Sequence, residues 1–175
     1  MGTILGLVLF SAILFFGFVL LGVFRTGLLP SYSAYSEYWE KAVPMNNMNL
    51  WSIITIAAAF LICPGLLELG VASVWQFLGF LVPVYLIMVA LTPDWYKDKK
   101  QYLWHCIAAA LCATGAFLWC LLVMHAGRIL IGVGVFIITL VLLTGTLKES
   151  YVFWLEMFMF ISVYLITILS LLALL

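Results

Sequence analysis

Residues 50–91 read LWSIITIAAAFLICPGLLELGVASVWQFLGFLVPVYLIMVAL, an apolar block with a single charged residue, Glu68. A helix needs about 20 apolar residues to cross roughly 30 Å of hydrocarbon. The block is about twice that length, and the charge and glycine at 68–70 are typical of a tight turn. We therefore predict two membrane spans in this block, at about 50–67 and 71–91.

The rest of the chain contains four more apolar stretches of similar length. They lie at about 3–24, 102–124, 128–145 and 151–175. The 175 residues are 67% hydrophobic and 8% charged, and their mean hydropathy of +1.29 is far above that of soluble domains. In lipid, a helix gives the backbone N–H and C=O groups of such a span their hydrogen-bond partners. We therefore expect a single all-α domain over 1–175, a polytopic integral membrane protein with six transmembrane helices.

The basic residues predict how this bundle sits in the membrane. Six spans place the connections 25–49, 92–101 and 144–150 on one face, and both termini on the other. The first face carries six of the seven lysines and arginines, and the other face carries Arg128. The positive-inside rule then puts the termini outside, and we expect a bacterial inner (cytoplasmic) membrane. Aromatic residues such as Trp95 cluster at span ends on the basic face, as in an interfacial belt.

The sequence predicts no metal, cofactor or nucleic-acid site. Its two histidines, His105 and His125, lie at opposite ends of the fourth span, about 30 Å apart at 1.5 Å per residue. The four cysteines lie inside spans without a Cys-x-x-Cys pair, as small packing residues do. The chain also has no phosphate loop, no dinucleotide-binding fingerprint and no basic arm.

An ionisable residue inside a span is costly and is a functional candidate by default. Glu156 lies about 8 Å into the sixth span, if that span starts near residue 151. Helical spacing puts Thr167 and Ser170 on its face, which we expect to point into the bundle. The alternative is a carboxyl near the headgroups, paired with a lysine such as Lys148.

His105 lies one turn into the fourth span. Ala109, Cys112 and Ala116 continue its helical face, and such small residues let helices pack closely. We therefore expect a close helix–helix contact along these small residues, with the histidine at the end of the contact near the membrane face. The histidine is either a packed, hydrogen-bonded residue or a catalytic or ligand-binding one.

The connection after the first span is long and aromatic. Residues 29–39 read LPSYSAYSEYW, and a long loop in a compact bundle tends to be functional or to pack over a site. We expect this loop to fold back as a lid, with Ser31, Ser33 and Glu37 as ligand-binding residues. Asp94 follows a proline on the same membrane face and is either a turn cap or a third catalytic candidate.

Short motifs around these candidates resemble those of a known group of membrane proteins. Pro30-Ser31-Tyr32-Ser33 follows the first span, and Pro93 lies in a turn. His105 then opens the fourth span and is followed by Ala109 and Phe117. The pattern resembles a broad six-span group that includes the DRAM-like autophagy modulators, the lipid-remodelling factors of GPI anchors and many bacterial membrane proteins.

The resemblance implies a six-span topology, a lipid ligand and a role for Ser31, Ser33 and His105. This chain has Tyr32 where the group has isoleucine, and Ala34 where its eukaryotic members usually carry aspartate. Eukaryotic members are usually drawn with the motif loop outside the cytosol. That orientation is the opposite of the one that the lysine count predicts.

Three functions remain open at this stage. The first is a module that binds a lipid or another apolar small molecule in a polar-mouthed pocket at one membrane face. The second is a lipid-modifying enzyme with His105 as general base, oriented by Glu156 or Asp94. The third is a small transporter or proton path through Glu156, although no polar line crosses the bilayer. Each is compatible with a homo-oligomer or a membrane-protein partner.

Overall fold

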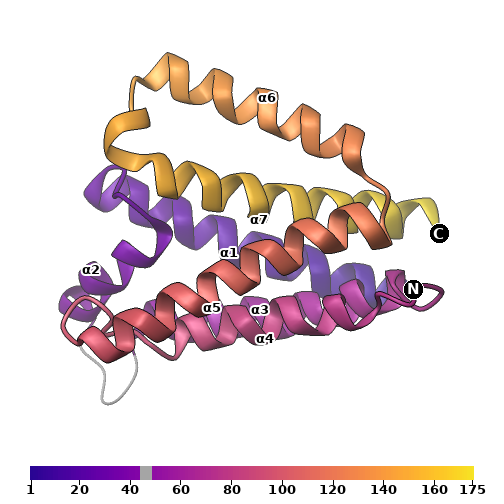
Figure 1. The fold of residues 1–175 in the computed structure, drawn as a ribbon, viewed down its shortest axis with the longest axis horizontal. Coiled ribbons are helices and arrows are strands. Elements are labelled where there is room, and N and C mark those ends of the chain that lie inside the picture. The colour runs from indigo at the N-terminus through magenta and orange to yellow at the C-terminus, as the bar shows by residue number, and fades with distance from the viewer. Residues whose placement is uncertain (44–48) are drawn as a thin grey trace.

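The computed structural model describes residues 1–43 and 49–175, and every element in these two ranges is a helix (Figure 1). The all-α class is therefore confirmed. A short helical segment, η1 (Tyr32–Ala34) with α2 (Tyr35–Ala42), occupies the connection after the first long helix. The long helices are α1 (Gly2–Thr26), α3 (Leu50–Leu69), α4 (Phe77–Ala90), α5 (Lys99–Leu118), α6 (Gly127–Thr144) and α7 (Leu147–Ala173).

Five of these helices are long and apolar enough to cross a membrane: α1, α3, α6, α7, and α5 together with the π-helical turn η2 (Trp119–Val123) that extends it. Large apolar side chains point outward from them, such as Phe24, which is 88% exposed. An exposed apolar surface of this extent suits lipid rather than water. The chain is a helical membrane protein.

The predicted span at 71–91 is where the structure differs from the sequence-based expectation. Its helix, α4, has 14 residues, about 21 Å at 1.5 Å per residue and less than the hydrocarbon thickness. Residues 70–76 form successive turns instead, in which the Gln76 side chain donates to the Leu67 carbonyl oxygen at 3.0 Å. Apolar residues in these turns, such as Val74, made them look like part of the span.

The helices run roughly along one long axis, and the two termini lie at the same end of the bundle (Figure 1). The opposite end holds residues 27–43, 91–98 and 145–150, and is called the lid end below. α6 packs on α7 at the outside of the molecule (Figure 1). The candidate residues of the long loop, α5 and α7 thus meet at the lid end.

Close packing of α3 against α4 depends on a glycine. A Cβ atom at Gly79 would lie 2.9 Å from the carbonyl oxygen of Leu66, which is shorter than a van der Waals contact. The missing side chain lets the two backbones approach, as small residues commonly do between membrane helices. Together with α5 and α7, this pair of helices encloses the interior that the lid end covers.

Candidate functional site

The loop after α1 folds into the bundle at the lid end. Tyr32 is 2% exposed, and its hydroxyl lies 2.7 Å from the Thr55 hydroxyl. Because Thr55 donates its own proton to the Trp51 carbonyl oxygen at 2.7 Å, Tyr32 is the donor of this bond. The Pro30 carbonyl oxygen accepts from the Phe153 amide at 3.0 Å, three residues after the non-helical Ser150 in α7. The loop is an integral part of the bundle.

Ser31 and Ser33 have different roles in this loop. The Ser31 hydroxyl oxygen accepts from the Ala34 amide at 3.1 Å and so caps η1. That cap starts a helical turn in which the Ser33 side chain reaches α5. Its hydroxyl oxygen lies 2.9 Å from Nε2 of His105.

A third hydroxyl orients His105. The Thr92 hydroxyl oxygen lies 2.9 Å from Nδ1 of His105 and 2.8 Å from the Val89 carbonyl oxygen. Since Thr92 has one proton and donates it to that carbonyl, it accepts from Nδ1–H. The neutral imidazole then has a free lone pair on Nε2, which accepts from the Ser33 hydroxyl. The Ser33 hydroxyl therefore donates to Nε2 of His105, and Nδ1–H of His105 donates to the Thr92 hydroxyl oxygen.

The Ser33–His105 pair is shielded from solvent. Ser33 is 4% exposed and His105 is 5% exposed. The Trp95 ring stacks on the imidazole, with 5.1 Å between centroids and 22° between planes. Trp95 thus covers the histidine, in addition to any contribution to the aromatic belt that the sequence predicts.

Glu156 binds the loop rather than the histidine. Its Oε2 accepts a hydrogen bond from the Tyr32 amide at 2.6 Å. The expectation that Glu156 or Asp94 orients His105 is wrong, because Thr92 holds Nδ1. The carboxyl instead joins α7 to the residue that precedes Ser33.

Asp94 and Glu37 lie at the surface of the lid end. Asp94 pairs with Lys97 at 3.0 Å, and Glu37 pairs with Lys41 one helical turn away at 2.7 Å. Their side chains are about half exposed, and neither lines the cavity described below. Lys97 also bonds Glu40 on α2 at 2.7 Å. The Lys97–Glu40 pair joins α2 to the connection between α4 and α5.

Glu40 is held by two partners in that connection. The Lys97 ammonium and the Tyr96 hydroxyl, both hydrogen-bonded to Glu40, lower the pKa of its carboxyl below the ordinary value. Such solvent-exposed pairs contribute little to the stability of a fold. They position the loop but do not form a ligand site by themselves.

A cavity of about 430 Å³ lies between α3, α4, α5 and α7. Its walls are apolar, and its polar groups include Ser33 and Glu156 at the lid end. Ala113 of α5 and Leu155 of α7 line it and are also exposed on the outer surface, Leu155 by 61%. The cavity therefore reaches the surface between α5 and α7.

The small residues that follow His105 on α5 line this cavity. Ala109, Cys112 and Ala116 all contribute to its wall. The expected close helix–helix contact is therefore only part of the explanation for this stripe. Cys112 also faces α4, with its thiol 3.5 Å from the Val82 carbonyl oxygen, whereas Ala109 is only half-buried. Small side chains here leave room between α5 and α7.

No metal cluster is found within residues 1–43 and 49–175, where no three His, Cys, Asp or Glu residues come close enough to hold an ion. The chain matches no family model, no curated protein and no solved structure.

Proposed function

We propose that this protein is a six-span integral membrane protein that binds a lipid in the cavity between α3, α4, α5 and α7. The cavity of about 430 Å³ supports this proposal, since it falls in the range of small-molecule sites, about 300–1,000 Å³. Such sites combine apolar walls with a few placed polar groups. Here the polar groups are Ser33 and Glu156, and the occupant would be amphipathic.

A lipid of the surrounding bilayer matches this arrangement. Its acyl chain would enter between α5 and α7, where Ala113 and Leu155 line the cavity and face outward. Its polar linkage would remain at the lid end, near Ser33 and Glu156. The apolar walls of the cavity and the polar groups at its lid end together favour a lipid over a water-soluble ligand.

Blocking the cavity should remove the lipid. Ala109→Phe places an aromatic ring in the cavity wall, and we expect it to lower lipid retention about tenfold or more, equivalent to about 1.4 kcal/mol. Lipid that co-purifies with the protein, quantified by mass spectrometry per mole of protein, measures this. The matched control is Ala110→Phe, one residue along on the exposed side of α5. Equal retention in the two variants would contradict the proposal.

Six crossings would put both termini on one side of the membrane. The short helix α4, which packs on α3 and α5, would complete the sixth crossing with the turns at its ends. We expect reporters that respond on only one side to give the same signal at the two termini. Opposite signals would mean that α4 does not cross.

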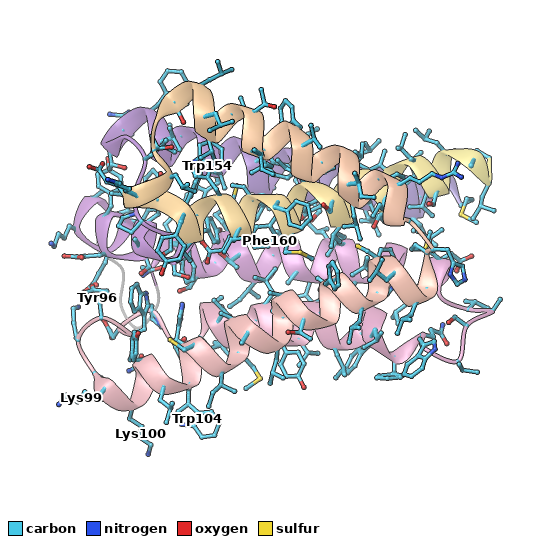
Figure 2. All side chains as sticks on the ribbon, turned by 45° about the horizontal axis from the view of Figure 1, so that its top comes forward. Tyr96, Lys99, Lys100, Trp104, Trp154 and Phe160 are labelled. Atoms are coloured by element: carbon cyan, nitrogen blue, oxygen red, sulfur yellow. The ribbon has the colours of Figure 1, made fainter. Side chains whose placement is uncertain are left out.

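The basic surface supports an inward-facing lid end. Figure 2 labels Tyr96, Lys99, Lys100 and Trp104 around the start of α5. Lysines with interfacial aromatic residues are typical of the cytoplasmic boundary of a span. We propose that the lid end faces the cytoplasm of a bacterial inner membrane, and the terminal reporters should then respond on the outer side.

A further inference from the structure

We propose that Ser33 is a nucleophile and His105 its general base, and that the pair transfers an acyl group from an ester lipid held in the cavity. This inference rests on the proposed function, because the lipid must first occupy the cavity. The observation that carries it is the 2.9 Å contact between the Ser33 hydroxyl and Nε2 of His105, at the polar end of an apolar cavity.

The hydrogen bonds meet the requirements of a serine nucleophile. Such a serine needs a base within about 2.6–3.2 Å, and the base needs a third group that fixes its orientation. Thr92 supplies the third group, because it accepts from Nδ1–H and leaves Nε2 free to take a proton. In serine hydrolases a carboxylate holds this position, and its loss is costly because the histidine adopts the wrong tautomer. Thr92 maintains the required tautomer without a charge.

The cavity gives a lipid ester access to Ser33 and not to His105. Ser33 lines the cavity, while His105 lies behind it, buried between Ser33, Thr92 and the Trp95 ring. A carbonyl carbon in the cavity would therefore meet the hydroxyl first. Among the described residues, the Ser33 amide makes no hydrogen bond, so it can donate to the developing oxyanion.

The reaction divides into two balanced steps. In the first, Oγ of Ser33 forms a bond to the ester carbonyl carbon and its proton moves to Nε2 of His105. The ester C–O bond then breaks, and His105 returns the proton to the leaving alcohol, a lysolipid. In the second, water or a lipid hydroxyl attacks the acyl-serine, His105 takes its proton, and the proton returns to Ser33 as the acyl group leaves.

An alkyl fluorophosphonate tests the nucleophile directly, since it forms a stable bond with activated serines. We expect it to label the detergent-purified protein on Ser33, located by peptide mass spectrometry. Ser33→Ala should lose the label completely. Ser36→Ala, a second buried serine of the same connection, should retain it. An unlabelled Ser33 in folded protein would overturn the proposal.

Vesicles of phosphatidylglycerol with labelled acyl chains test turnover. Release of lysolipid with free fatty acid would identify water as the acceptor, and acylation of added lysolipid would identify a lipid hydroxyl. Either product, lost in Ser33→Ala, supports the proposal. We expect His105→Gln to slow turnover by about 10²–10⁴-fold, the usual contribution of a general base. If the fluorophosphonate does not label the protein and neither lipid product forms, the acyl-transfer step is contradicted.

Thr92 is a positioning residue, and its variants separate orientation from folding. Thr92→Val removes the acceptor for Nδ1–H, and we expect labelling to slow by about 10²-fold. Thr92→Ser keeps the hydroxyl and should restore the rate, although it lacks the methyl group. If the labelling rates of the two variants change with their thermal stability and not with the presence of the hydroxyl, the contact between Thr92 and His105 is purely structural.

Lipid retention distinguishes failure of this inference from failure of the proposed function. Thr92→Val changes a residue outside the cavity lining and should still retain lipid. Retained lipid with an unreactive Ser33 in the wild-type protein would overturn acyl transfer and leave the binding function intact. Absence of lipid, with retention equal in Ala109→Phe and Ala110→Phe, would instead reject the binding function.

Discussion

Phe15→Ala is expected to lower the free energy of unfolding by about 3–5 kcal/mol, the usual cost of removing a fully buried phenylalanine. Phe15 is 0% exposed, in the middle of α1. Its ring lies 4.4 Å from that of Phe160 on α7 and 5.0 Å from that of Tyr32 in the loop. Truncation would leave a void beneath the loop that carries Ser33. Unfolding in detergent, titrated with dodecyl sulfate, measures the loss.

Phe10→Ala is the matched control on the same helix. Phe10 is 57% exposed on the outer surface, so its truncation removes lipid or detergent contacts and leaves no internal void. We expect its free energy of unfolding to stay within about 0.5 kcal/mol of wild type. If both variants lost the same free energy of unfolding, the described packing of α1 against α7 and the loop would be contradicted.

Glu156→Ala should destabilise the protein by about 1–3 kcal/mol, the usual cost of leaving a buried donor without a partner, and should weaken lipid retention. The Tyr32 amide would lose its acceptor in this variant. The loop residue next to Tyr32 is Ser33, so release of the loop would also disturb the polar end of the cavity. Thermal unfolding and lipid content, measured on the same preparation, test the two effects together.

Two variants make the Glu156 result specific. Glu156→Gln keeps an acceptor oxygen for the Tyr32 amide and should lose less stability than Glu156→Ala. Glu68→Ala removes an exposed carboxyl at the end of α3, far from the lid end, and should change neither quantity. Loss of lipid in Glu68→Ala would show that retention depends on net charge and not on the contact with Tyr32.

The sequence predicted the long helices well and α4 poorly. Observed ends of α1, α3, α5 with η2, α6 and α7 lie within about one helical turn of the predicted spans. Hydropathy is a sum over neighbouring residues, and it reports a long apolar helix reliably. It cannot separate a helix from apolar turns, and residues 70–76 form such turns.

The candidate residues were predictable as a set, but their partners were not. Ser33, His105 and Glu156 were recognisable because polar groups near or within apolar spans require partners. Thr92 carried no signal, since a threonine at the end of a span is unremarkable in a sequence. Only the fold of the α4–α5 connection places its hydroxyl at Nδ1 of His105.

The sequence by itself determined the helical class, the membrane environment and the gathering of polar residues towards one end. These properties follow from composition and from helical spacing, both of which are local. The tertiary structure decided that Ser33 contacts His105 across 72 residues of chain and that Glu156 contacts Tyr32 across 124. It also decided that the small residues of α5 border a cavity. Such contacts depend on how helices pack and how the loop folds between them, and local sequence patterns do not encode those distances.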